Sequence, residues 1–162
     1  MQRKQTASMT TKVIIDAEDF LEQLEDEFNK EVVFGVIDKD GRGSRVRSAD
    51  GDLTLNQLFT ILHEGSEAKN IPPRPIVDRL LESDQDYFIG LLEEYVIGRS
   101  KPDWETVGRL SAARLRIAFD QWQELGIAPN HPETIKRKGS QDPLVETGKL
   151  KAHINYAVKD KK

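Results

Sequence analysis

The residues of this chain that could carry out metal chemistry do not have the spacing that a metal site needs. His63 and Glu64 are followed by Gly65, and the second histidine that a zinc-protease helix requires four residues on is absent. The segment 38–41, Asp-Lys-Asp-Gly, resembles the start of a calcium loop. However, Arg42 stands where another oxygen ligand belongs, and no glutamate closes the frame. These patterns favour a turn, and we expect no metal ion.

The residue patterns that nucleophilic catalysis needs are also absent from the sequence. Ser140, Asp142 and Glu146 lie close in sequence, but no Gly-x-Ser-x-Gly elbow presents a serine. The glycines within 41–43 are not in the strand-to-helix setting of a phosphate-binding loop. The chain has no cysteine, which excludes thiol nucleophiles, thiolate metal sites and disulfides. We therefore expect a protein that is not an enzyme and has no cofactor.

Charge is distributed unevenly along the 162 residues. Charged residues make up 32% and hydrophobic residues 37% of the chain, which is typical of soluble proteins, and no apolar run approaches the ~20 residues of a membrane-spanning helix. Residues 1–12 carry a net charge of +3, residues 13–128 carry −11 and residues 129–162 carry +4. An acidic body disfavours general nucleic-acid binding, because affinity for phosphate depends on cations gathered on one surface. The basic run 136–138 could instead bind an acidic neighbour.

Hydrophobic periodicity predicts the helices that position these residues. Amphipathic helices are expected near 17–29, 54–64, 75–97 and 104–125. Thr54 and Gln57 have the spacing of a capping box, and the third apolar stripe is continuous enough to predict one long helix. We expect residues 1–11 to form a disordered arm and residues 12–162 to form a single domain.

Two strands complete the predicted fold. The segment 31–38 is rich in β-branched and aromatic residues and is expected to be buried on both faces. The segment 149–158 alternates strictly, and a period of two places its apolar side chains on one face of a strand. These side chains are Leu150, Ala152, Ile154, Tyr156 and Val158. Pairing the two strands in a small antiparallel or mixed sheet beneath the helices predicts an α+β fold.

Two longer segments carry a resemblance to a known family. They are LTLNQLFTILHEGSEAKNIPPRPIV (53–77) and HPETIKRKGSQDPLVETGKLKAHINYAV (131–158). In this order and at this spacing they resemble the phage virion-morphogenesis, or tail-completion, family, which includes minor tail and neck components involved in head–tail joining. The structural or interface positions that the resemblance and the local patterns single out are His63, Glu64, Gly65, Pro72, Arg74, Pro75, Lys136, Arg137, Lys138, Gly139, Thr147, Gly148, Leu150, Ile154 and Tyr156.

The resemblance implies a structural virion protein at the neck or tail end of a tailed phage, present in the host cytoplasm during assembly. It implies a ring of six or twelve copies, with other neck, portal-side or tail proteins as partners and no membrane partner. DNA would pass through the channel without specific binding. A competing interpretation is a small nucleic-acid-associated protein that uses its basic termini, and salt-sensitive DNA binding by the isolated monomer would favour it.

Within the resembling segments, Arg74 and the pair Thr147-Gly148 are predicted to be structural joints. Arg74 lies between Pro73 and Pro75, which would set the angle at which the next helix begins. Gly148 would permit a turn before the last strand that a side chain forbids.

Overall fold

The computed structural model describes residues 29–37, 45–48, 51–99, 101–143 and 148–161. Its elements are β1 (Lys30–Val36), β2 (Arg45–Ser48), β3 (Gly51–Thr54), α2 (Leu55–Glu64), η1 (Glu67–Lys69), α3 (Ile76–Ser83), α4 (Gln85–Tyr95), α5 (Trp104–Asp120), α6 (Pro132–Lys138), α7 (Lys149–Ala152) and β4 (Ile154–Asp160). Small antiparallel sheets packed with helices confirm the α+β fold. The arm predicted for 1–11 and all but the last residue of the helix predicted for 17–29 lie outside the described residues. None of the described helices is long and apolar enough to cross a bilayer.

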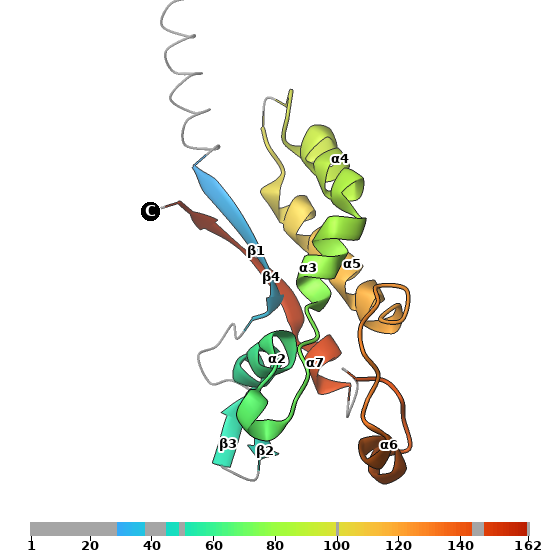
Figure 1. The fold of residues 1–162 in the computed structure, drawn as a ribbon. Coiled ribbons are helices and arrows are strands. Elements are labelled where there is room, and N and C mark those ends of the chain that lie inside the picture. The colour runs from blue at the N-terminus through green and yellow to red at the C-terminus, as the bar shows by residue number, and fades with distance from the viewer. Residues whose placement is uncertain (1–28, 38–44, 49–50, 100, 144–147, 162) are drawn as a thin grey trace, which may run out of the picture.

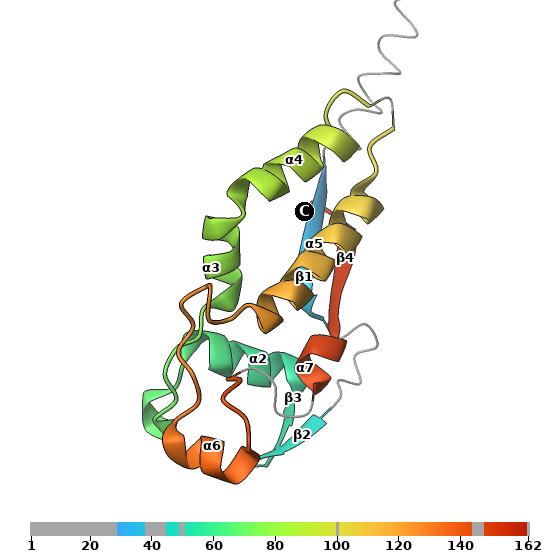
Figure 2. The ribbon, with the colours of Figure 1, turned by 90° about the vertical axis from the view of Figure 1, so that its right-hand side faces the viewer.

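Strands β1 and β4 form a two-stranded antiparallel ribbon with one covered face. On that face the register pairs Val32 with Val158, Phe34 with Tyr156, and Val36 with Ile154. Helix α5 contacts both strands, and α3 and α4 lie on the same side of the ribbon (Figures 1 and 2). The Phe34 ring stacks on Phe88 of α4 with centroids 5.7 Å apart. The prediction that segment 31–38 is buried on both faces is wrong, because the side chain of Val33 is 37% exposed on the other face.

At one end of this ribbon, a side-chain ion pair and a backbone hydrogen bond join the first and last strands of the described chain. The Lys30 ammonium pairs with the Asp160 carboxylate at 2.5 Å. The Lys161 backbone N–H donates to the Asn29 carbonyl oxygen at 2.5 Å. The predicted pairing of an early strand with the terminal strand is therefore confirmed for Lys30–Val36 and Ile154–Asp160.

The alternating segment 149–158 is a strand only in its second half. Residues 149–152 form the short helix α7, and β4 begins at Ile154. Gly148 precedes α7 with a φ of 69°, a left-handed conformation that glycine adopts without strain. From α7, Leu150 reaches the core whereas Ala152 is exposed. The prediction that five apolar side chains share one face of a strand is thus wrong for Leu150 and Ala152, which lie on α7. It is confirmed for Ile154, Tyr156 and Val158.

The single helix predicted over 75–97 is two helices, α3 and α4, which meet at Asp84. The Ser83 hydroxyl donates to the Leu80 carbonyl oxygen at 3.2 Å and to the Asp84 carboxylate at 3.1 Å, and such local bonds compete with the regular helix. Asp84 also forms an ion pair with Arg114 of α5. The change of direction at this point lets both helices contact α5 (Figure 2).

Helix α5 begins as its sequence predicts and ends five residues early. The Asp103 carboxylate accepts a hydrogen bond from a first-turn backbone N–H at 3.0 Å, and this bond lowers the pKa of Asp103. The helix was predicted to continue to residue 125 but ends at Asp120. Beyond it, the Trp122 indole N–H donates to the Asp142 carboxylate at 3.0 Å, and the Trp122 carbonyl oxygen accepts from the Ile127 N–H at 3.0 Å. These bonds hold the segment as a turn.

Helix α2 is confirmed at both ends. The Thr54 hydroxyl accepts from the Gln57 N–H at 3.2 Å, and the Gln57 side-chain oxygen accepts from the Thr54 N–H at 2.9 Å, which completes the predicted capping box. The helix stops before Gly65, whose N–H donates to the Ile61 carbonyl oxygen at 2.9 Å. The hairpin of β2 and β3 leads directly into this helix.

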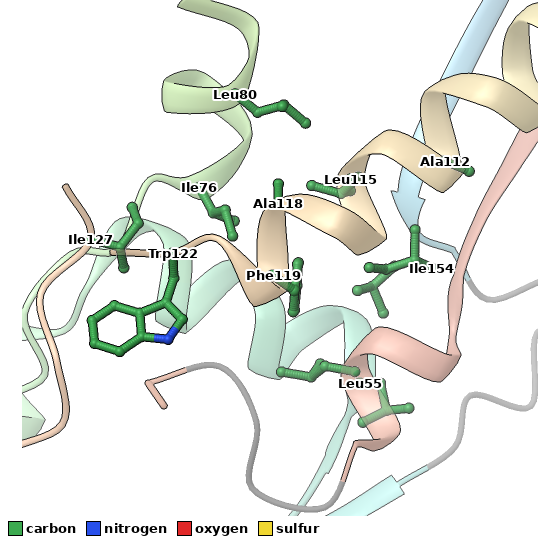
Figure 3. Close-up of a cluster of buried hydrophobic side chains, with 12 residues drawn as sticks. Leu55, Ile76, Leu80, Ala112, Leu115, Ala118, Phe119, Trp122, Ile127 and Ile154 are labelled. Carbon is green, nitrogen blue, oxygen red and sulfur yellow. The ribbon is translucent and has the colours of Figure 1, made fainter. Parts of the chain in front are cut away.

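The core lies where α2, α3, α5 and the start of β4 meet (Figure 3). Its largest fully buried side chains are Phe119, Ile76, Leu80, Leu115 and Ile154. Leu55 of α2 and Trp122 extend this cluster toward the end of the molecule that carries α6 (Figures 2 and 3). The core therefore connects the ribbon to the segments that contain the predicted site residues.

We expect Gly108→Ala to lower the free energy of unfolding by about 2 kcal/mol. A Cβ at Gly108 in α5 would overlap the ring of Tyr156 in β4, with the ring Cγ only 2.9 Å away. Gly90→Ala in α4 is a matched control, because nothing lies within 4 Å of its added Cβ. Alanine should raise the stability there by about 0.5–1 kcal/mol through its helix propensity. Urea denaturation of both variants tests the contact, and equal effects would contradict it.

Candidate functional site

The first resembling segment forms a close turn after α2. Ser66 and Ile71 exchange backbone hydrogen bonds of 2.8 and 2.9 Å across this turn. Gly65, which precedes it, has a φ of 81° and a ψ of 178°, a region essentially restricted to glycine. A Cβ at Gly65 would lie 2.8 Å from the Pro73 nitrogen and 2.9 Å from the Ile71 carbonyl oxygen. Both the backbone conformation and the lack of space therefore require glycine at this position.

Arg74 connects this turn to the loop that precedes α6. Its backbone N–H donates to the Leu62 carbonyl oxygen at 2.9 Å. Its guanidinium donates to the Ala128 carbonyl oxygen at 3.4 Å and to the Asn130 side-chain oxygen at 3.5 Å. Only 6% of Arg74 is exposed, and this burial lowers the pKa of the guanidinium. These contacts give Arg74 the position that a structural joint needs.

Asn130 fixes the base of the loop that carries α6. Its backbone N–H donates to the Gln141 carbonyl oxygen at 3.2 Å. Its side-chain amide donates to the carbonyl oxygens of Asp142 at 2.8 Å and Ser140 at 3.5 Å. The side chain is buried. These hydrogen bonds hold the two ends of segment 130–142 together, and α6 lies between the two ends in sequence.

Sequence reasoning did not single out Asn130. Its only local signal is the stretch 128–132, Ala-Pro-Asn-His-Pro, where the prolines predict a loop and asparagine is a residue type that bonds nearby backbone. Nothing in that stretch identifies 140–142 as the backbone it bonds. The hydrogen bonds by which Asn130 holds the loop together can be identified only from the structure.

Helix α6 presents a basic last turn. The His131 ring nitrogen Nδ1 accepts from the Glu133 N–H at 3.4 Å, so His131 caps the helix. Lys136, Arg137 and Lys138 form the last turn, where positive charge complements the helix dipole. The helix stops before Gly139, which has a left-handed φ of 72°. The basic run singled out in the sequence is thus on one short helix.

A cleft of about 1220 Å³ lies between the turn after α2, the loop 129–143 and α7. Five Lys and Arg side chains and three Glu side chains line it, and Leu58, Leu62 and Leu150 contribute apolar surface. Of the predicted site residues, the cleft gathers Glu64, Gly65, Pro72, Arg74, Arg137, Lys138 and Leu150. The two resembling segments, which are far apart in sequence, therefore share one concave surface.

The other predicted site residues do not line the cleft. His63 packs against Phe59 with ring centroids 6.0 Å apart, and its Nε2 lies 3.8 Å from the Asp78 carboxylate. Tyr156 lies in the ribbon, where its hydroxyl is hydrogen-bonded with Glu105, and this bond raises the pKa of Tyr156. The remaining residues are Pro75 before α3, Lys136 and Gly139 on α6, Gly148 before α7 and Ile154 in the core, whereas Thr147 lies outside the described residues.

We expect Asn130→Ala to lower the free energy of unfolding by about 1–2 kcal/mol. The substitution removes the amide that bonds the carbonyl oxygens of Ser140 and Asp142 and leaves the Arg74 guanidinium with one fewer acceptor. Gln141→Ala is the control, because this neighbouring side chain is exposed and only its backbone bonds Asn130. Chemical denaturation measures both, and equal stability of the two variants would contradict the function assigned to Asn130.

Gly148→Val should lower the stability by about 1–2 kcal/mol, because valine is strained at the left-handed φ of 69°. Nothing lies within 4 Å of an added Cβ, so the cost comes from the backbone alone. Gly148→Asn is the control, since asparagine tolerates this conformation. Thermal denaturation of both variants tests the joint, and a valine variant as stable as the wild type would rule it out.

The described ranges contain no group of three His, Asp or Glu side chains arranged to hold a metal ion. Comparisons of the chain with family models, with curated proteins and with solved structures find no match. The cleft combines Lys and Arg side chains, a buried guanidinium, glutamates and apolar side chains in one concavity.

Proposed function

We propose that this chain is a structural protein of a tailed-phage virion, which completes the neck or the tail end and enables head–tail joining. It assembles with copies of itself in a ring of six or twelve around the DNA channel. Its other partners are neighbouring neck, portal-side or tail proteins. DNA passes through the ring without specific binding, and the protein acts without a cofactor.

One observation carries this proposal: the two segments that resemble the phage family meet at the cleft. Arg74 in the first segment bonds Asn130, which immediately precedes the second. Residues from both segments then line the same concave surface. A chance resemblance at two separate places in the sequence does not require the two places to adjoin in space. A shared assembly surface does require it.

The shape of the molecule supports assembly in a ring. Helix α4 lies at one end and α6 at the other, and the ribbon runs alongside α4 and α5 (Figures 1 and 2). A ring needs two different surfaces on each copy, which bind each other and close by rotation. An elongated subunit with chemically different ends provides such a pair. The cleft beside α6 supplies the more basic of these ends.

Deletion of the gene from the phage genome that encodes it tests the proposal. Electron microscopy of the lysate should show intact heads beside intact but unjoined tails, and the wild-type gene supplied in trans should restore joined particles. The protein should also co-purify with restored virions at a constant ratio. Normal particles from the deletion strain would overturn the proposal. Salt-sensitive DNA binding by the isolated monomer, without incorporation into particles, would replace it with the nucleic-acid interpretation.

A further inference from the structure

We propose that one strip on helix α4 docks in the cleft of the next copy of this chain. The strip consists of Asp86, Ile89, Leu92 and Glu93 and is called the α4 strip below. This inference rests on the proposed ring for its biological setting, but its physical basis is independent of phage assembly. It assigns the two surfaces through which neighbouring copies meet.

The α4 strip combines negative charge with exposed apolar area. Asp86, Ile89 and Glu93 are spaced three and four residues apart, so they lie on one face of the helix, and Leu92 lies one turn from Ile89. Ile89 is 44% and Leu92 38% exposed, and both carboxylates are exposed. Further exposed large apolar side chains on or next to α3 and α4 are Leu81, Tyr87 and Ile97. Exposed apolar side chains that lie beside charged ones on one helix face are typical of interaction sites.

The cleft has the complementary chemistry. Arg137 of α6 and Lys149 of α7 are exposed residues in its lining and can pair with the two carboxylates of the α4 strip. Arg74 adds a buried positive charge, and its two side-chain hydrogen bonds within the described structure use only part of the five N–H donors of a guanidinium. Leu58 and Leu62, which are only partly buried, offer apolar surface to Ile89 and Leu92. The five Lys and Arg side chains of the lining outnumber its three glutamates, so a partner with carboxylates beside aliphatic side chains fits this cleft.

The positions of the two surfaces identify a second copy as that partner. Helix α4, which carries the strip, and helix α6, which contributes to the lining of the cleft, lie at opposite ends of the subunit (Figure 2). Contact between unlike surfaces leaves one of each kind free on every pair, so further copies add until the assembly closes. The charge distribution agrees, because residues 13–128, which include the strip, carry −11 and residues 129–162, which supply α6 and α7, carry +4.

Charge reversal of each surface tests the docking in the full-length protein. The strip variant carries Asp86→Lys and Glu93→Lys, and the cleft variant carries Arg137→Glu and Lys149→Glu. All four side chains are exposed, so both variants should fold, which circular dichroism checks. A control variant with Glu31→Lys and Glu124→Lys, two exposed positions outside both surfaces, has the same change in net charge as the strip variant.

Sedimentation velocity at low salt over a range of protein concentrations gives the readout. The wild type and the control should form species larger than a dimer, and each surface variant alone should self-associate at least about tenfold more weakly. An equimolar mixture of the two variants should associate more strongly than either variant alone, because the intact strip of one variant meets the intact cleft of the other, and the reversed strip and reversed cleft again carry opposite charges. A wild type that stays monomeric, variants that assemble like the wild type, or a mixture that stays monomeric would each overturn the docking.

Particle production separates this inference from the proposed function. If the gene deletion leaves unjoined heads and tails but both surface variants assemble and restore virions, only the docking fails. If the deletion strain makes normal virions while the variants lose self-association as expected, only the proposed function fails.

Discussion

Phe119→Ala should lower the free energy of unfolding by about 3–5 kcal/mol, which approaches the whole stability of a small domain. Phe119 is 0% exposed and belongs to the cluster in which α2, α3, α5 and β4 meet. Its ring stacks on Phe59 of α2 at 6.0 Å between centroids. Truncation would leave a cavity at the point that joins the ribbon to the α2 end, and the surrounding helices can fill it only in part.

Ile117→Ala is the matched control for Phe119→Ala. Ile117 lies two residues earlier on the same helix but is 47% exposed, so its truncation should cost less than about 1 kcal/mol. Urea denaturation followed by tryptophan fluorescence measures both, since Trp122 lies in the same cluster. A cost for Phe119→Ala as small as that of the control would show that the core does not depend on this ring.

Gly65→Ala should cost about 3–4 kcal/mol, a large effect for the addition of one methyl group. Part of the cost is the backbone conformation, with φ of 81° and ψ of 178°, which alanine adopts only under strain. The rest arises because the methyl group would meet backbone atoms of Pro73 and Ile71 at 2.8 and 2.9 Å, and neither can rotate away. The turn that forms one wall of the cleft would have to open.

Gly139→Ala separates these two contributions. Gly139 also has a positive φ, 72°, but nothing lies within 4 Å of an added Cβ. Its substitution should therefore lower the free energy of unfolding by only about 1 kcal/mol, because alanine is strained in the left-handed backbone conformation. Chemical denaturation gives both values. Equal costs at the two glycines would show that the close approach of Pro73 to Gly65 contributes nothing.

The sequence predicts an element well where all its signals are local. Helix α2 has a capping box at Thr54, a helical apolar stripe and a terminal Gly65, and both ends are confirmed. The break between α3 and α4 has a weaker local signal, because the apolar stripe continues across it and only Ser83 and Asp84, which can bond nearby groups, mark it. The contact of Asp84 with Arg114, thirty residues further along the chain, adds a bond that no local pattern predicts. A contact between residues so far apart in sequence does not change the local hydrophobic periodicity, so the sequence does not predict it.

The terminal segment shows how one pattern can fit two structures. Alternation from Leu150 to Val158 matches a strand, yet Leu150 and Ile154 are also four residues apart, a spacing that suits a helical turn. The left-handed Gly148 starts the helix, and the strand begins only after His153. The pairing partner in β1 was predictable, since few other β-branched segments are available, whereas the helical turn was not.

The candidate site was predictable in its outline. The motifs identified Gly65, whose backbone geometry requires glycine, and Arg74, whose guanidinium donates hydrogen bonds to the loop before α6. They did not identify Asn130, because its partners at 140–142 reach it only when the loop folds back around α6. Likewise, no pattern in the sequence shows that α6 would lie beside the turn after α2.

The antiparallel ribbon also determines how the subunit bears tension. Asn29 and Lys161 lie side by side at one end of the ribbon, so a pull on these two points would separate β1 from β4 one hydrogen-bonded pair at a time. Unzipping of this kind requires far less force than sliding two strands past each other along their length. Attachment through both of these points would make the subunit mechanically weak, whereas a load applied along α3, α4 and α5 would be carried by helices that contact one another.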